Sequence, residues 1–310
     1  MVLLVERLSK LYCKLEGHLH HSHESEALQA SFQAFQSNLS VCLNQLSFNT
    51  KPGSEFFSFP WIQQCFELLP SINKAFAKLV VDIDYPMSKW EADSVEEYLN
   101  YSLCLLELLN SITSTISHLG QARLALSHAL GLVEKSRALA IKRLSAIQVK
   151  SSSPRKELKE PEDKEGDEAK AFANKERVIH QALIEIKSIG FWVCGVILAG
   201  LSGDAEHFLK MRKSQGFSNS ALSKLDSSIC EVIKGKGGVL KEVKELKDSA
   251  DCLAAAADTS KSRGVAEELQ RRLDVFEKLL DSFGKEVDHL FSKLLAGRNE
   301  LLDGIRHHNK

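Results

Sequence analysis

The amino-acid sequence predicts an all-α protein, an elongated multi-helix bundle with long amphipathic helices and one flexible charged linker. Over long stretches the apolar side chains recur at steps of three and four residues, which is the spacing of one face of a helix. Proline, which interrupts helices, occurs only 6 times in 310 residues. The hydrophobic fraction of 44% and the charged fraction of 26% are ordinary for a soluble globular protein. A chain of this length can bury about three-quarters of its unfolded surface without a disulfide or a metal.

Composition divides the chain into four parts. We predict a flexible His-rich N-terminal arm over residues 1–23, an N-terminal helical part over 24–149, a disordered linker over 150–170 and a C-terminal helical part over 171–310. The C-terminal part is expected to pack with the N-terminal part into one bundle.

The N-terminal part opens with two predicted helices. The first spans about 24–46, where the apolar residues share one face. The second begins near Pro60, because proline is tolerated in a first turn, and runs to Ile83. Pro70 lies inside it, so we expect a break or kink there, with Leu69 biased away from the helical region.

A third helix in this part has the strongest apolar periodicity of the chain. Ser88 and Glu91, in the sequence SKWE, have the spacing of a capping box. In such a box the Ser88 hydroxyl accepts from the backbone N–H of residue 91, and the Glu91 carboxylate accepts from the backbone N–H of Ser88. The apolar run from Val95 to Leu119 follows it. Gly120 is expected to mark a bend, after which the helical pattern resumes up to Ile147.

The linker separates this part from four further predicted helices. Residues 150–170 contain one Leu and no aromatic or β-branched residue, so they cannot bury enough apolar surface to offset chain entropy. Helical patterns then cover about 171–201, 218–234, 238–257 and 263–306. The last of these is strongly amphipathic, with apolar residues at steps of three and four from Val265 to Leu294.

One apolar segment is a candidate for either a central core helix or a membrane helix. Ser188–Gly203 is a run of 16 uncharged residues, whereas a membrane-spanning helix needs about 20. The small residues at 190, 195, 199 and 203 favour close helix packing, so we prefer the core interpretation and keep membrane insertion as the alternative. The large side chains of this segment are Phe191, Trp192, Val193, Val196, Ile197, Leu198 and Leu201.

Several other patterns are weak as sites. The His cluster at 18, 20, 21 and 23 crowds within six residues, which suits adventitious rather than structural metal binding. The sequence GKGGV at 235–239 lacks the spacing of a phosphate loop. Asp82 and Asp84 are a close acid pair at a turn, where Asp usually serves the backbone. We therefore predict no catalytic, cofactor-binding or metal residues, no cofactor and no small-molecule ligand.

Charge and cysteine content bear on partners and compartment. The formal net charge is −1, which gives no general attraction to nucleic acid. The 7 Cys are odd in number and form no CxxC, as expected of free thiols in a reducing compartment. Early acidic residues and a very short apolar start argue against a secretory or plastid leader. We predict an intracellular, cytoplasmic protein, with a place on or anchored in the endoplasmic reticulum or another endomembrane as the alternative.

Several segments together resemble the plant BYPASS family, which includes exocyst-interacting ROH-type relatives. They are FPWIQQCFELL, DIDYPMSKWEADSVEEYL, LLELLNSITSTISHL, GVILAGLSG and EVDHLFSKLLAGRNELLDGIR, in family order from about residue 30 onward. The resemblance implies an all-α plant protein without a known catalytic site. It also implies a role in restraining a mobile, root-derived signal that arrests shoot growth, and it links ROH-type relatives to the exocyst and secretion. The family has no established site residues to carry over.

Our leading hypothesis is a non-catalytic helical regulatory protein that acts on plant root and shoot development by binding other proteins. By resemblance, exocyst-type subunits are candidate partners. The alternative is a membrane-peripheral adaptor of the secretory or exocyst machinery, using residues 189–201 or the amphipathic C-terminal helix. A third hypothesis, an enzyme of unknown reaction, has no motif in its favour.

Overall fold

The computed structural model describes residues 21–48, 58–133, 174–204, 208–209, 212, 219–236, 240–256 and 262–308. These ranges contain the helices α2 (His21–Phe48), α3 (Phe59–Asp82), α4 (Ala92–Gly131), α6 (Asn174–Ser202), α8 (Ser220–Lys236), α9 (Lys241–Ala256) and α10 (Ser262–His308), together with a short 3₁₀ helix, η1 (Met87–Lys89). The described ranges contain no strand, so the all-α prediction is confirmed. The predicted linker over 150–170 lies outside them, as does most of the predicted arm.

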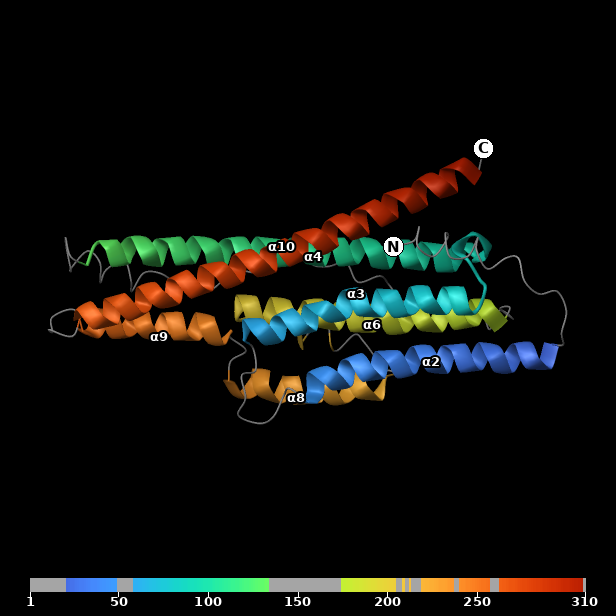
Figure 1. Cartoon of the computed structure of the whole chain (residues 1–310), viewed down its shortest axis with the longest axis horizontal. Helices are drawn as coiled ribbons and strands as arrows, with labels where there is room; N and C mark the ends of the chain where they lie inside the picture. Colours follow the sequence, from blue (N-terminus) through green and yellow to red (C-terminus); the bar gives the residue numbers. More distant parts are fainter. Residues whose placement is uncertain are drawn as a thin grey trace.

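The helices run mostly along one long axis and stack in layers (Figure 1). At one side α10 packs against α4 and, near its beginning, against α9. The middle of the bundle holds α6, which contacts α4, α3 and α2, and α2 is in turn flanked by α3 and α8. In the view of Figure 1, α10 crosses α4 obliquely and its C-terminal end projects beyond the other helices. The helix α6 therefore lies between α4 on one side and α2 and α3 on the other.

The amphipathic pattern of α10 is used as the sequence predicts. The residues buried along it follow steps of three and four: Leu269, Leu273, Phe276, Leu280, Phe283, Val287 and Leu290. Two of its aromatic rings pack edge to face on α3, where the ring centroids of Phe66 and Phe283 are 5.3 Å apart and those of Phe59 and Phe276 are 5.6 Å apart. The edge-to-face geometry favours such pairs beyond their burial alone, so these rings help to hold α10 on the bundle.

The N-terminal backbone N–H groups of α3 are capped by Ser58 and by a distant helix, and a tight turn follows its C-terminus. The Ser58 hydroxyl accepts from the backbone N–H of Trp61, and the carboxylate of Glu242, in the first turn of α9, accepts from the backbone N–H of Phe59 at 3.1 Å. At the other end Asp84 takes a positive φ of 48°, which Asp tolerates better than most residues. The turn that Asp84 makes lets the N–H of Tyr85 bond to the carbonyl of Val80 at 3.2 Å.

The expected break at Pro70 does not occur, because α3 continues through this residue. Pro70 removes one helical hydrogen bond, but it lies on the exposed face of α3. The opposite face of the helix is buried in the core through Phe66, Leu69 and Ile72. Close by, the Asn73 carboxamide donates to the carbonyl of Leu69 at 2.9 Å. Burial of one face thus outweighs the local preference against a helix.

The predicted capping box is also wrong. The N-cap of α4 is Glu91, it makes no side-chain capping bond, and the helix begins at Ala92. The reason lies in Trp90, which is buried and donates its indole N–H to the carbonyl of Tyr85 at 3.0 Å. This contact holds residues 90 and 91 extended, so Ser88 falls in η1 rather than at a helix start. Gly120, where a bend was expected, lies inside the uninterrupted α4.

Candidate functional site

The apolar segment singled out in the sequence forms the second half of α6. Phe191, Trp192, Val193, Val196, Ile197 and Leu201 are buried and Leu198 is half-buried. Among the described residues, α6 is the one helix long and apolar enough to cross a membrane, and 78% of its apolar window is buried inside the bundle. The structure therefore places these side chains in the protein interior. Membrane insertion of this helix stays a prediction.

Gly190 lets α6 approach α4 closely. A Cβ atom at this position would lie 2.7 Å from the hydroxyl oxygen of Tyr101, and the ring of Tyr101 packs edge to face on Phe191 with centroids 5.9 Å apart. Burial raises the pKa of Tyr101. Its hydroxyl is buried and has no hydrogen-bond partner among the described residues. The small-residue face that the sequence indicated is thus used for packing here.

A buried carboxylate joins α6 to α8. Asp226 accepts from the indole N–H of Trp192 at 3.1 Å and also from the Nε–H of Arg212. Asp226 is only 1% exposed and Trp192 2%, so the pair replaces water on both groups. Removing one partner of such a buried pair lowers the free energy of unfolding by several kcal/mol. We interpret the pair as a structural link between α6 and α8.

A second polar cluster lies at the surface between α4 and α6. The Glu97 carboxylate accepts from Lys187 Nζ at 2.9 Å and lies 2.9 Å from Nδ1 of His180. The hydrogen bond to Glu97 raises the pKa of His180. Burial alone would raise the pKa of Glu97, but the bonds from His180 and Lys187 outweigh it and lower that pKa. The contact with Glu97 therefore favours the protonated form of His180.

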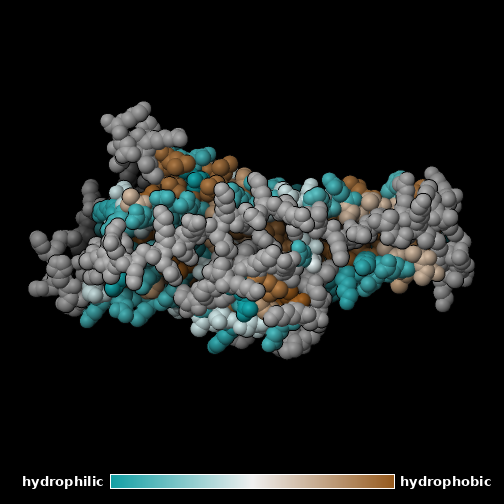
Figure 2. All heavy atoms as spheres, turned by 180° about the vertical axis from the view of Figure 1, so that it is seen from behind, coloured by the Kyte–Doolittle hydropathy of each residue, from teal (hydrophilic) through white to brown (hydrophobic). Residues whose placement is uncertain are grey.

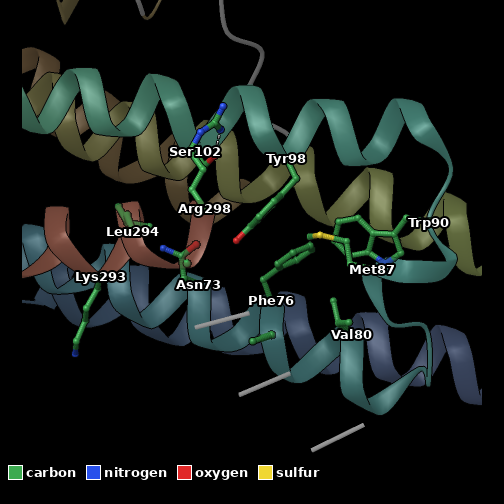
Figure 3. Close-up of a pocket in the computed structure, with 12 residues that line it drawn as sticks. Asn73, Phe76, Val80, Met87, Trp90, Tyr98, Ser102, Lys293, Leu294 and Arg298 are labelled. Atoms are coloured by element: carbon green, nitrogen blue, oxygen red, sulfur yellow. Dashed lines mark hydrogen bonds between the residues drawn. The ribbon is translucent and has the colours of Figure 1, made fainter. Parts of the chain in front are cut away.

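One pocket lies where α10 leaves the surface of α3 and α4 (Figure 3). Its volume is about 50 Å³, and it is partly open to solvent. The apolar wall is made by Phe76, Ala77, Val80, Met87, Trp90, Tyr98 and Leu294, and the remaining lining residues are Asn73, Ser102, Lys293, Gly297 and Arg298. Three rings of the wall pack on one another, with Phe76 5.9 Å from Trp90 and 6.1 Å from Tyr98 between centroids.

The pocket has polar groups at its centre and along one side. In Figure 3 the Tyr98 hydroxyl and the Asn73 carboxamide point toward each other in the middle of the pocket. Arg298 runs along one side to α4, where it donates to the Ser102 hydroxyl at 2.7 Å and to the carbonyl of Leu99. Lys293 extends away from the pocket in this view. No carboxylate is among the lining residues, so the charges beside this pocket are positive.

Other candidate groups are placed apart from the pocket. Burial raises the pKa of Cys65 and raises that of Cys194 to about 12, so these thiols keep their protons as buried structural groups do. The predicted pair Asp82 and Asp84 ends α3 at the surface. Within the described ranges no three His, Cys, Asp or Glu residues are grouped as metal ligands would be. The side chains of the His cluster lie outside the described residues.

The described surface carries several exposed apolar side chains. Figure 2 shows the rear face, where hydrophobic side chains emerge in separate patches among hydrophilic ones. The large exposed apolar residues are Val41, Leu103, Leu124, Ile184, Val275 and Leu295. The last turns of α10 differ from this pattern, because Leu295 is 39% exposed and the half-buried Phe291, Leu294, Leu301 and Leu302 lie close to it along the helix.

The pocket was not predicted from the sequence. Tyr98 was visible only as an apolar position of a helix, Trp90 only as part of a misassigned cap, and Arg298 as one of many charges of an amphipathic helix. No signal in the sequence brings these residues together, because they belong to segments far apart in the chain.

Comparison with known proteins gives a consistent picture. The family model described as Protein BPS1 matches residues 87–303. The UPF0496 protein 4 of Oryza sativa subsp. japonica is 25% identical over 313 residues, covering 92% of this chain and 67% of the relative. The protein of the same name from subsp. indica is 25% identical over 297 residues, covering 86% and 63%. Protein BPS1, chloroplastic, of Arabidopsis thaliana is 26% identical over 300 residues, covering 88% and 82%.

The chain spans about two thirds of the length of the two rice relatives. No solved structure matches it.

Proposed function

Because the chain belongs to the family of Protein BPS1, we propose that it is a non-catalytic regulatory protein that acts by binding other proteins. In this proposal it restrains production of a mobile root-derived signal and so controls root and shoot development. The names of the three relatives describe no reaction, which favours regulation over catalysis. The family resemblance noted in the sequence supports the developmental role.

The last turns of α10 are the observation that carries the proposal. The apolar stripe of this helix continues past Leu290, which is buried, to the half-buried Leu294, and Leu295, which is 39% exposed, lies beside the stripe. Leu301 and Leu302 remain half-buried at the end of the stripe. An amphipathic helix that is only partly covered presents apolar anchors at helical spacing, which is a common mode of recognition by partner helices or grooves. This surface is the proposed contact with protein partners.

We also propose a cytoplasmic location, with exocyst-type subunits as candidate partners. The Arabidopsis relative is named as chloroplastic, so a plastid location is the direct competitor. A membrane-peripheral adaptor of secretion remains the second candidate, supported by the apolar composition of α6.

Proximity labelling in plant cells tests both proposals. The full chain, fused to a labelling enzyme, should mark a reproducible set of cytoplasmic proteins, and Leu295→Glu should remove that set while leaving helical circular dichroism unchanged. Leu124→Glu is the matched control, because Leu124 is an exposed apolar residue of α4 at 57% exposure. A labelled set that is plastidic, or that Leu295→Glu does not alter, contradicts the proposal. Exocyst and membrane proteins as the dominant set would favour the adaptor.

Complementation tests the developmental role separately. The chain expressed in Arabidopsis plants that lack Protein BPS1 should restore shoot growth, and the Leu295→Glu variant should not. Normal accumulation of the chain without any recovery of growth would reject the proposed role.

A further inference from the structure

The pocket between α3, α4 and α10 continues along α10 as an apolar groove. Phe76, Val80 and Met87 form one side of the pocket (Figure 3). On α10 the half-buried Leu294 lines it, and Leu301, also half-buried, follows seven residues later on the same face of the helix. We call the pocket and this continuation the α3–α10 groove.

The size of the pocket suits one apolar side chain better than a separate small molecule. Its volume is about 50 Å³ and it is partly open to solvent, whereas a cavity that binds benzene measures about 150 Å³. A helix lying in the groove places one side chain in the pocket and its other apolar residues along Leu294 and Leu301. Apolar residues at helical spacing are the anchors of this helix-in-groove mode of recognition.

The segment that precedes α2 has the pattern that this groove requires. Residues 1–20 lie outside the described residues. Their apolar residues at steps of four and three are Leu4, Leu8, Leu11 and Leu15. These steps are typical of one face of a helix, and Ser9 and Cys13 fall on the opposite face. The sequence of this segment therefore predicts a short amphipathic helix.

Chain connectivity brings this segment to the end of the bundle that holds the groove. In Figure 1, α2 begins at the end where α3 ends and α4 begins, and those parts of α3 and α4 line the pocket. The chain that precedes α6 also arrives at this end, but the large apolar residues within 150–173 are only Leu158 and Phe172. Residues 134–149 follow α4 at the opposite end. The segment before α2 is therefore the better candidate to fill the groove.

The connection to α2 is also long enough. The helix α3 contacts both α2 and α10, and the axes of packed helices are about 8–10 Å apart. Residues 16–20 span up to about 17 Å when extended, which suffices to pass from α2 across α3 to the groove. A helix of residues 3–15 is about 20 Å long, so it can follow α10 past both Leu294 and Leu301.

From these observations we infer that residues 3–15 dock as an amphipathic helix in the α3–α10 groove of the same chain. Leu8 or Leu11, at the centre of the stripe, enters the pocket, and the other leucines lie along α10. The docked segment covers the α10 stripe beside Leu295 and so limits the access of a partner to the last turns of α10. This consequence rests on the proposed function, whereas the docking itself does not.

The test follows the ¹⁵N signal of the Trp90 indole N–H in the full chain, because Trp90 lines the pocket. The signal is assigned by its loss in Trp90→Phe. In the double variant Leu8→Asp with Leu11→Asp the segment should leave the groove, and the Trp90 signal should move. The signals of Trp61 and Trp192, which are buried elsewhere in the core, should stay in place. An unmoved Trp90 signal overturns the inference.

A matched variant controls for the added charge. Ser9→Asp with Cys13→Asp introduces the same two carboxylates on the opposite face of the segment, so the Trp90 signal should keep its wild-type position. An equal shift in this variant and in the leucine variant overturns the inference, because the apolar face would then have no special role.

A peptide of residues 1–17 tests docking directly. Added to the leucine variant, it should return the Trp90 signal saturably to its wild-type position, with a Kd of about 0.1 mM. A short connection gives an effective concentration of about 1 mM, so the segment of the wild-type chain would be docked about nine-tenths of the time. Absence of a saturable return up to about 2 mM peptide overturns the inference.

Two further variants locate the peptide in the groove. In the background of the leucine variant, Ala77→Met should narrow the pocket and weaken peptide binding about fivefold or more. Ala296→Met, at an exposed position of α10, should leave the binding unchanged. Equal binding to the Ala77→Met variant overturns the placement in the pocket.

Dilution separates docking within one chain from exchange between two copies. Docking within the chain leaves the wild-type Trp90 signal and the sedimentation coefficient unchanged from about 10 to 300 µM protein, because no association is involved. A signal that moves with concentration as dimers form would place the segment in a second copy and overturn the inference. None of these measurements includes a partner, so their failure is distinguishable from failure of the proposed function.

Discussion

At the residue scale, the contact of Gly190 with Tyr101 decides how closely α4 and α6 approach. No side chain fits at residue 190 without moving the Tyr101 hydroxyl, which would lie 2.7 Å from a new Cβ. That hydroxyl is itself buried without a hydrogen-bond partner in the described part of the chain, so it contributes packing but no hydrogen bond there. The close packing of α4 and α6 in the centre of the bundle thus depends on the absence of a side chain at residue 190.

We expect Gly190→Ala to lower the free energy of unfolding by about 1–2 kcal/mol, because overpacking a core is costly and the better helix propensity of Ala returns only part of the loss. Urea unfolding measures the change. Tyr101→Phe alone should be neutral or slightly stabilising, since the buried hydroxyl has no partner to lose. In the Tyr101→Phe background the cost of Gly190→Ala should shrink. An equal cost in both backgrounds would show that the hydroxyl is not the obstacle.

The cluster of Glu97, His180 and Lys187 makes stability depend on pH. The folded pKa of His180 is raised above its ordinary value of 6.5, so its contribution is complete below about pH 6.5 and is lost as pH rises through the raised value. Glu97 has a lowered pKa, so its contribution is present above the ordinary carboxyl pKa and is lost as pH falls through the lowered value.

Wild type should accordingly be more stable than His180→Gln at about pH 5.5, and the difference should fade toward about pH 8.5. His180 has a side chain that is 48% exposed, so we expect less than about 1 kcal/mol. Unfolding curves at several pH values measure it, with His118→Gln on the exposed side of α4 as control. A difference that grows with pH would contradict the assigned pairing.

At the element scale, α3 shows how a helix survives an interior proline. Its buried face includes Phe66, Leu69 and Ile72 around Pro70, and its N-terminus is held both by Ser58 and by Glu242 of α9. These tertiary contacts offset the missing backbone hydrogen bond at Pro70. The helix is therefore stabilised by its neighbours more than by its own residue preferences.

Pro70→Ala should raise the free energy of unfolding by about 1–2 kcal/mol, because it restores a helical N–H and removes the ring clash, less the greater freedom of the unfolded chain. The Ser71→Ala variant, at the half-buried neighbouring position, is the control and should change stability by less than about 0.5 kcal/mol. Thermal and urea unfolding measure both. A destabilised Pro70→Ala variant would indicate that the proline conformation is required by the packing of α3.

At the scale of the whole molecule, α6 is the centre on which the other helices assemble. It contacts α2, α3 and α4, and its apolar side chains are enclosed by them along most of its length. The same composition would also suit a membrane. In the bundle, α6 is surrounded by other helices, whereas in a membrane it would be surrounded by lipid. Lipid could replace the neighbouring helices only if the bundle opened.

Fractionation of the wild-type full chain from plant cells separates these two states. We expect the protein in the soluble fraction, or released from membranes by carbonate, because a helix covered by protein has little apolar surface left for lipid. A membrane-spanning helix stays in the pellet until detergent is added. Resistance to carbonate, together with protease protection of one side of residue 195, would reject the core interpretation in cells.

The sequence was sufficient for the helices and their apolar faces. Helical periodicity is a local property, so the stripe from Leu269 to Leu290 could be recognised before any partner was known, and it is buried as predicted. The same holds for the apolar content of α6. Its role as a central helix needed one further fact, the close approach at Gly190, which depends on the neighbour that it meets.

Tertiary structure alone decided the exceptions and the candidate site. Pro70 remains helical, and Trp90 displaces the expected cap, because burial against distant residues outweighs local preference. The pocket is lined by Asn73, Tyr98 and Arg298 from α3, α4 and α10. The spacing of these residues in the sequence does not predict that they lie close together. Local sequence patterns determine which face of a helix is apolar. Which neighbouring helix that face packs against depends on the free energy of the whole core.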